Sequence, residues 1–260
     1  MSKDFSPNSI TSGLHTKRIG KNVLYYPSLS STMDTARGNA RQGAEEGTVI
    51  IAGEQTGGRG RLQRAWLSPE GNIALSIILH PDVAALPYLI MVASLAVAYS
   101  IESITGLKPQ IKWPNDILID GRKVCGILIE NEVKGNKAVF SIVGIGINVD
   151  LKVADYSAIS ATAASLKGES EKDDLRLKII RSLFTEFEKL YLKLPHGKSV
   201  YEAWRDRLVT LSKKVRATYG SQIIEGIAES VDESGTLSIR QSDGSLITVV
   251  AGDVTLRENK

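Results

Sequence analysis

The sequence predicts a mixed α/β protein with a largely antiparallel sheet and packed helices, followed by a small all-β tail. In residues 1–212, Val- and Ile-rich runs alternate with helical spacing, and hairpin-type turns such as DG and KGN separate three of the runs. After Ser212, short runs are parted by YGS, ESG and SDG, which predicts a small β-barrel. We therefore expect two domains, 1–212 and 213–260.

The first part of the chain alternates strands and helices. Residues 21–27 predict a strand that runs out at Pro27 into Ser and Thr, after which we expect a helix at 33–44. Apolar runs bounded by glycine at 47–56 and 71–79 predict strands on either side of a basic, glycine-rich loop.

A long helix, a meander and two further helices complete this domain. The apolar stretch 86–101 is shorter than the roughly 18–20 residues that cross a bilayer and contains two serines, so we expect a buried helix within 85–105. Three β-rich runs follow in 110–149. Apolar residues at helical spacing, with acidic residues at the start, predict a helix at 173–194, and 199–208 predicts another.

Composition excludes several classes of protein. The chain has 260 residues with 32 Lys and Arg against 29 Asp and Glu, and this net charge of +3 does not favour a polyanion as the default partner. One cysteine and three scattered histidines cannot form a disulfide framework or a Cys/His zinc site. Residues 1–8 lack the pattern of a secretory signal. We expect a cytoplasmic protein that does not bind a membrane.

The most informative segment is GEQTGGRGRLQRAW, residues 53–66. Its glycines let the backbone approach a ligand or change shape, and Arg59, Arg61 and Arg64 add three permanent cations, which favours a phosphate or carboxylate ligand. Taken alone, the loop fits a solvated surface loop or a nucleic-acid patch equally well.

Two further segments favour a ligand site. KWPNDI places a lysine, a tryptophan, an amide and a carboxylate around Pro114 at the end of a strand. Lys123 follows in GRKVCGILIE, and Asn148 follows in GIGINV. Neither GKS at 197–199 nor GIGINV is a nucleotide motif, because each lacks a required glycine and the expected strand-to-helix turn.

Together with SSTMD and GDVTLR, these segments resemble the catalytic domain of a biotin protein ligase, from about residue 12 to the end. The resemblance implies a class II synthetase-like domain and an SH3-like barrel. It also implies ATP-dependent attachment of biotin to a lysine of a biotin carboxyl carrier protein through biotinyl-5′-AMP, with Mg²⁺ beside ATP. One departure is Gln63, where the family usually has glycine, and this puts loop flexibility in doubt.

The resemblance also implies roles for individual residues. The catalytic set is Lys123, Arg61, Arg64 and Asp116. The biotin set is Ser31, Thr32, Gln55, Gly58, Arg59, Lys123 and Gly126. The ATP set is Arg61, Arg64, Trp66, Asn115, Asn148 and Arg257, and no metal ligand is assigned.

Several alternatives stay open from the sequence. Asp116 could take part in proton transfer or cap a turn, Arg257 could be an exposed terminal arginine, and Trp113 could be core rather than ligand. Cys125, which shares strand alternation with Lys123, is more typical of a buried apolar residue than of a nucleophile. The whole chain could instead be a lipoate ligase or acyltransferase, or a nonenzymatic biotin or nucleotide sensor.

The expected partners follow from the ligase interpretation. Residues 1–20 are too few for the helix-turn-helix domain of the regulatory members of the family, so we expect a dedicated ligase without specific DNA binding. The acceptor carboxylase is not revealed by the sequence, and a homodimer stays open.

Overall fold

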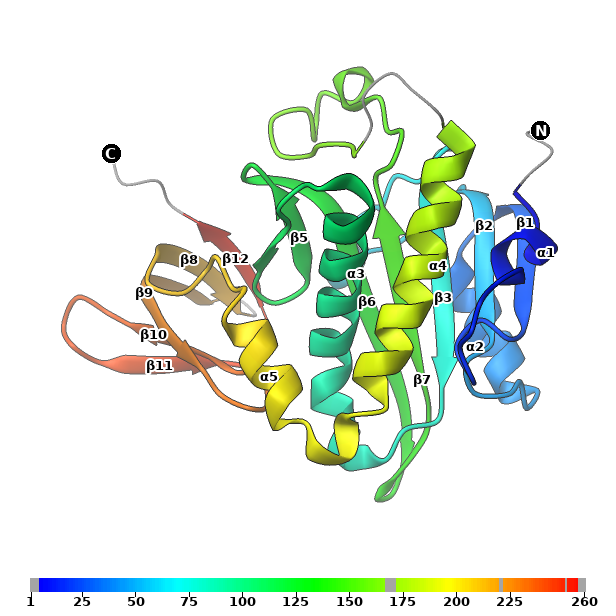
Figure 1. Ribbon diagram of the computed structural model, residues 1–260. Helices are drawn as coiled ribbons and strands as arrows, with labels where there is room; N and C mark the ends of the chain where they lie inside the picture. Colours follow the sequence, from blue (N-terminus) through cyan, green and yellow to red (C-terminus); the bar gives the residue numbers. More distant parts are fainter. Residues whose placement is uncertain (1–4, 167–171, 220–221, 251, 257–260) are drawn as a thin grey trace.

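The computed structural model describes residues 5–166, 172–219, 222–250 and 252–256, which form two sheets with helices packed around the larger one (Figure 1). The larger sheet has the strand order β1-β2-β3-β7-β6-β5-β4. Its strands are β1 (Val23–Leu29), β2 (Val49–Gln55), β3 (Ile73–Leu79), β4 (Gln110–Lys112), β5 (Asp116–Ile119), β6 (Arg122–Lys134) and β7 (Lys137–Ile147). Only the β1–β2 pair of this order is parallel, so the mixed, largely antiparallel sheet is confirmed.

Helices lie on both faces of this sheet. The main core fills the face under α3 (Leu89–Thr105) and α4 (Lys172–Tyr191), where Ile51 of β2 points. A smaller cluster fills the face under α2 (Thr32–Arg41), where Ile50 points. Neighbouring residues of one strand thus enter different cores, as strand geometry requires. The remaining helical segments are α1 (Pro7–Thr11), α5 (Lys198–Arg205) and the 3₁₀ turns Arg61–Gln63, Val83–Tyr88, Val153–Asp155 and Leu194–His196.

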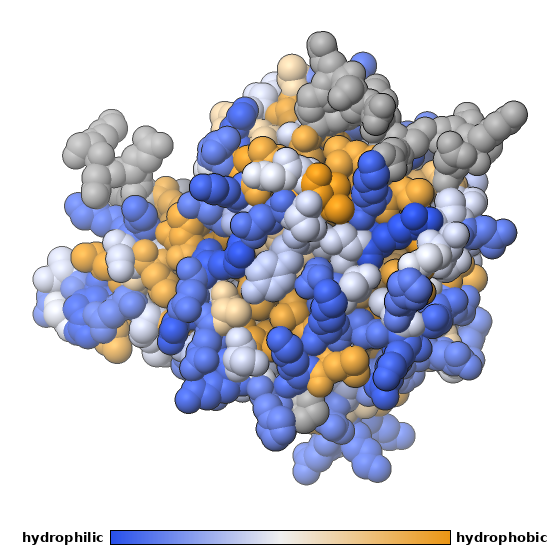
Figure 2. Space-filling model, viewed as in Figure 1, coloured by the Kyte–Doolittle hydropathy of each residue, from blue (hydrophilic) through white to orange (hydrophobic). Residues whose placement is uncertain are grey.

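The apolar helix is a core element. Among the described residues, one stretch, Val83–Thr105, is long and apolar enough to cross a membrane, but most of its apolar window is buried inside the protein. Hydrophilic side chains are spread over the face of the molecule that α4 and α5 present, with apolar groups between them (Figure 2). The prediction of a buried helix is confirmed.

The tail forms a five-stranded antiparallel sheet in the order β11-β10-β9-β8-β12. Its strands are β8 (Lys214–Tyr219), β9 (Gln222–Val231), β10 (Leu237–Arg240), β11 (Leu246–Val249) and β12 (Asp253–Leu256). This number of strands fits the small SH3-like architecture that we expect. Buried residues of the tail belong to the same apolar cluster as α3 and α4, and the division of the chain at residue 212 stays a prediction.

The two sheets are joined beside the KWPNDI segment. The N–H of Ile111 in β4 donates to the carbonyl oxygen of Arg207. The carbonyl oxygen of Ile111 accepts a hydrogen bond from the N–H of Val209. The indole of Trp113 is 1% exposed and donates to the carbonyl oxygen of Gly235, at 2.8 Å. Trp113 is therefore a core residue at the junction of the two sheets, and Trp204 is fully buried as well.

One local expectation is wrong, and one short helix was not predicted. β1 continues past Pro27 to Leu29, because β1 is an edge strand paired only with β2, and the missing N–H of proline costs nothing on its open side. The short helix α1 was not predicted; Ser6 caps it by accepting from the N–H of Ser9, whose hydroxyl oxygen in turn accepts from the N–H of Ser6.

Glu188 of α4 ties the N-terminal segment to the helix layer. Its buried carboxylate accepts the backbone N–H groups of Lys17, Arg18 and Ile19 at 2.6, 2.7 and 3.0 Å. Burial by itself raises the pKa of Glu188, but these hydrogen bonds and the charge of Arg18 outweigh it and hold the pKa below its usual range.

Glu188→Gln should lower the free energy of unfolding at pH 7 by roughly 1.5–3 kcal/mol, because charge-assisted hydrogen bonds are lost. A depressed folded-state pKa contributes stability above the ordinary glutamate pKa and loses it as pH falls through the folded value. The difference between mutant and wild type should therefore shrink below about pH 4. Urea unfolding at pH 7 and pH 3 measures it, with Glu186→Gln on the same helix as control; equal losses at both pH values would contradict this role.

Candidate active site

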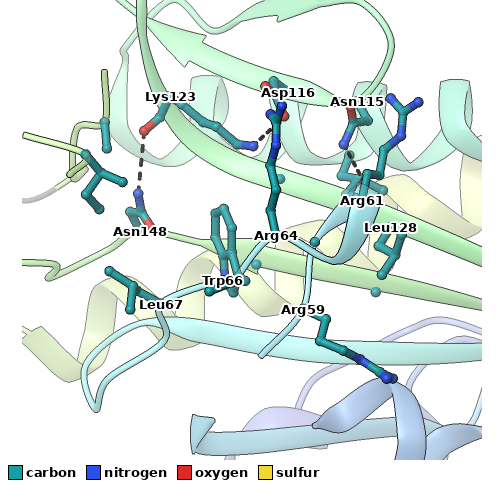
Figure 3. Close-up of a pocket in the computed structure, with 18 of the residues that line it drawn as sticks. Arg59, Arg61, Arg64, Trp66, Leu67, Asn115, Asp116, Lys123, Leu128 and Asn148 are labelled. Carbon is teal, nitrogen blue, oxygen red and sulfur yellow. Dashed lines mark hydrogen bonds and ion pairs between the residues drawn. The ribbon is translucent and has the colours of Figure 1, made fainter. Parts of the chain in front are cut away.

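A pocket of about 550 Å³ opens over the larger sheet, beside α2 (Figure 3). Among the glycines that line it, three lie within strands: Gly126 of β6, and Gly144 and Gly146 of β7. A Cβ on Gly144 would lie 2.5 Å from Sδ of Met33, and one on Gly146 would lie 2.3 Å from Nε1 of Trp66. These two strand positions therefore need glycine, because α2 and Trp66 approach the backbone closely.

One wall of the pocket carries a connected set of small polar groups. Oε1 of Gln55 accepts from the backbone N–H of Thr32 at 2.8 Å and from its hydroxyl at 3.0 Å, and Ser76 donates to that hydroxyl at 2.8 Å. Ser31 is the N-terminal cap of α2, yet its hydroxyl makes no capping bond. Both residues line the pocket, so the amide N–H₂ of Gln55 and the Ser31 hydroxyl can serve a polar ligand group there.

A β-bulge turns Lys123 into the pocket. Across β5 and β6, Ile117 pairs with Cys125, but the next residue, Leu118, pairs with Lys123, so Val124 is the extra residue. The expected shared alternation of Cys125 and Lys123 is therefore wrong: the cysteine lies in the apolar core, whereas the lysine lines the pocket. Burial raises the pKa of the Cys125 thiol, which keeps it protonated and unreactive.

Lys123 is held by a carboxylate and an aromatic ring. Its Nζ lies 2.6 Å from Oδ1 of Asp116 and 5.3 Å from the ring centre of Trp66. Lys112 also lines the pocket, with Nζ 3.9 Å from Oδ2 of Asp116. Asp116 thus fixes two ammonium groups at the pocket.

The basic loop is folded back on itself as a tight hairpin. The N–H of Trp66 donates to the carbonyl oxygen of Gly58 at 2.9 Å, and the N–H of Gly60 donates to that of Arg64 at 2.7 Å. At its tip, Leu62 and Gln63 have φ of 54° and 58°, the left-handed region that favours glycine. Gln63 therefore holds a strained backbone at the position where the family pattern has glycine.

Two asparagines brace the site through their side-chain amides. Asn115 donates to the carbonyl oxygen of Ile127 at 2.8 Å and accepts from Arg61 at 3.0 Å. Asn148, nearly fully buried, donates to the carbonyl oxygen of Ala164 at 3.1 Å. Both amides therefore hold protein segments in place beside any contact with a ligand.

The structure brings most of the predicted site residues together. Those lining the pocket are Ser31, Thr32, Gln55, Arg59, Arg61, Arg64, Trp66, Asn115, Asp116, Lys123, Gly126 and Asn148. Gly58 lies just behind the lining, where a Cβ would be 3.0 Å from Nε2 of Gln55. Arg257 lies outside the described residues.

Sequence reasoning missed three parts of the lining. Lys112 stood in the quoted KWPNDI motif but was given no role. Residues 159–163 were given neither a structure nor a role. The backbone carbonyl oxygen of Thr162 accepts from the backbone N–H of Lys123 at 2.8 Å, and this bond holds the segment against β6. Thr255 and Leu256 of β12 also reach the pocket from the tail; both stood in the quoted GDVTLR motif, of which only Arg257 was given a role.

Comparisons with known proteins agree with this geometry. The model of the biotin/lipoate A/B protein ligase family matches residues 25–148, and that of the biotin protein ligase C-terminal domain matches 210–257. The bifunctional ligase/repressor BirA of Bacillus subtilis is 36% identical over 258 residues, covering 96% of this chain and 79% of that protein. The biotin–[acetyl-CoA-carboxylase] ligase of Paracoccus denitrificans is 33% identical over 211 residues, covering 78% of this chain and 88% of that protein.

A solved structure shows the same fold with ligands. The biotin protein ligase of Aquifex aeolicus, in complex with biotin and ATP, superposes with a TM-score of 0.74 and 28% identity, covering 92% of this chain and all of that one. A cationic pocket on a mixed sheet, followed by a small β tail, defines the protein class. This chain belongs to the biotin/lipoate A/B protein ligase family, among the biotin protein ligases.

Gly146→Ala should displace Trp66 from the sheet, because its Cβ would overlap the indole. Trp113 and Trp204 are 1% and 0% exposed, so acrylamide quenching of fluorescence reports mainly on Trp66. We expect the quenching constant to rise about twofold or more, since overpacking costs roughly 1–3 kcal/mol. Gly38→Ala is the control, because a Cβ there meets nothing within 4 Å. Unchanged quenching in a folded Gly146→Ala protein would remove the glycine's assigned role.

Proposed function

We propose that this protein joins biotin to ATP, giving biotinyl-5′-AMP and pyrophosphate, and then transfers the biotinyl group to a lysine amine of a biotin carboxyl carrier protein, releasing AMP. The observation that carries the proposal is the pocket, which combines a polar wall at Thr32 and Gln55 with a fixed ammonium at Lys123. The ligand complexes of the Aquifex protein support it.

The first half-reaction requires two anions to meet, because the carboxylate of biotin attacks the α-phosphate of ATP. Their repulsion dominates the barrier, and cations fixed in a partly buried site lower it without reorganisation. We propose that Lys123 lies between the two anions, since Asp116 holds its Nζ in place. Arg61 and Arg64, which line the same pocket, would contact the phosphates.

The biotin and adenosine groups have different needs. The ureido ring of biotin requires hydrogen-bond donors and acceptors in a mostly apolar pocket. We propose that Ser31, Thr32 and Gln55 supply these groups, and that the backbone at Gly58 and Arg59 closes the site. For ATP, we propose that Trp66 packs against adenine. Asn115, Asn148 and Arg257 complete the proposed nucleotide contacts.

Magnesium fits this site as part of the nucleotide substrate. Mg²⁺ prefers oxygen ligands and commonly binds through one or two carboxylates and substrate phosphates. Asp116 is the carboxylate among the described residues that line the pocket, and no cluster of three or more His, Cys, Asp or Glu side chains occurs among them. We propose that the ion arrives with ATP and supplies charge neutralisation for the departing pyrophosphate.

Asp116 has two proposed roles in the second half-reaction. Its carboxylate orients Lys123 directly, and we propose that it also accepts a proton from an incoming lysine amine. We further propose that the protein is cytoplasmic. Sedimentation in solution distinguishes a monomer from a homodimer.

Pyrophosphate release on incubation with ATP, Mg²⁺ and biotin tests the proposed function. An adenylating enzyme releases pyrophosphate only when biotin is present, whereas a nonenzymatic sensor binds without turnover. Replacing biotin with lipoate in the same assay decides between the two acids, and faster release with lipoate would overturn the assignment.

Lys123→Ala should slow adenylate formation at least tenfold, because losing a charge-assisted contact costs roughly 1.5–3 kcal/mol. Thermal unfolding should change far less than the rate. The matched control is Lys134→Ala, at the exposed far end of the same strand. Adenylation at the wild-type rate by the Lys123 variant would remove this residue from the chemistry.

Binding to DNA should show no sequence preference. The described residues before β1 contain one five-residue helix, α1, which is too short to serve as a recognition helix, while the arginine-rich loop can give weak, salt-sensitive attraction. Titrations with DNA of different sequences at physiological salt, with and without biotin and ATP, measure this. A tight, sequence-selective complex that strengthens as the adenylate forms would show a repressor, as in the name of the Bacillus relative.

A further inference from the structure

The glycine-rich loop is anchored to two different walls of the pocket by the arginines on either side of Gly60. Arg61 donates to the amide oxygen of Asn115, at the β4–β5 turn. Arg59 pairs with Asp34 of α2, with Nη2 and Oδ1 2.5 Å apart. Figure 3 shows the Arg59 side chain directed away from Lys123 and Asp116. The loop therefore spans the pocket from one wall to the other.

Asp34 is itself fixed by a second arginine. Nη1 of Arg37 lies 2.8 Å from the same Oδ1, and Nη2 of Arg37 bonds to Glu130 of β6. Asp34 thus separates two guanidinium groups, and Glu130 completes a chain of four alternating charges from β6 to the loop. The pKa of Arg37 is raised, first by its hydrogen bond to Glu130, which outweighs the opposing effect of burial.

The folded loop needs such anchors. Its tip places Leu62 and Gln63 in left-handed conformations, each of which costs on the order of 1 kcal/mol for a residue other than glycine. Leu62 is also 66% exposed, so packing of its side chain does not supply much compensation. Strained backbone persists only where surrounding contacts hold it.

We propose that Asp34 is a positioning residue that latches the loop over the pocket through Arg59. Asp34 lies in the first turn of α2, two residues after Thr32, so one helix end carries both the polar pocket wall and the latch. The consequence rests on the proposed function: a mixed anhydride in the pocket is retained and shielded from water while the loop is latched.

The latch is tested first without any ligand, by limited trypsin digestion of the free protein. Asp34→Asn should raise the rate of cleavage after Arg61 and Arg64 about fivefold, since a half-exposed ion pair contributes up to roughly 1 kcal/mol. Asp34→Glu should restore much of the protection. The matched control is Glu132→Gln, which breaks the Arg41–Glu132 pair between the same helix and the same strand, 2.8 Å in length, away from the loop.

Catalytic measurements separate a latch from a general effect on folding. With biotin, ATP and Mg²⁺ but no acceptor, the initial burst of pyrophosphate from Asp34→Asn should stay within about twofold of wild type. The later steady release of AMP should rise about fivefold as the adenylate escapes or hydrolyses. In the double variant Asp34→Asn with Arg59→Gln, the effect should be no larger than in Asp34→Asn alone, because that single variant has already lost the Arg59–Asp34 pair.

Each result decides for or against the latch. Cleavage of Asp34→Asn at the wild-type rate, the same acceleration in Glu132→Gln, or additive effects in the double variant would overturn it. Absence of a pyrophosphate burst from the wild-type protein would overturn the proposed function instead, and the cleavage rates of the free proteins would still decide on the latch.

Discussion

The site depends on the absence of side chains at three glycine positions of the larger sheet, which leaves a hollow above its strands. A strand in a covered sheet normally fills both faces with side chains, but β6 and β7 present Gly126, Gly144 and Gly146 to the pocket, next to Met33 of α2 and Trp66. The missing side chains leave room for Met33 and Trp66 close to the backbone and for a ligand beside them. The remaining faces of the central strands are packed with Ile, Leu and Val, which makes the floor rigid.

Backbone geometry then directs charged side chains toward this hollow. The bulge at Val124 directs Lys123 to the pocket, while Cys125 stays in the core. Asp116, at the start of the neighbouring strand β5, fixes the ammonium group. A flexible lysine is thereby held in one place before substrates arrive, which is the condition for electrostatic stabilisation of two converging anions.

The loop differs in kind from the rest of the site. Strands and α2 are held by buried apolar contacts, whereas the contacts shown for residues 57–66 include a few hydrogen bonds and the half-exposed Arg59–Asp34 ion pair. Such contacts are individually weak and reversible. A rigid floor beneath a weakly latched cover suits a reaction that has to admit two substrates, exclude water and then expose its intermediate to a protein acceptor.

The sequence by itself determined the order of the elements, the buried apolar helix and the family motifs, because hydrophobic periodicity, turn residues and short motifs are local signals. Those motifs also named most residues of the pocket. Only the tertiary structure decided which way Lys123 points, since a bulge depends on pairing with β5. It also decided that residues 159–163 reach the pocket and that Asp34 meets Arg59, because contacts between segments distant along the chain leave no periodic trace in the sequence.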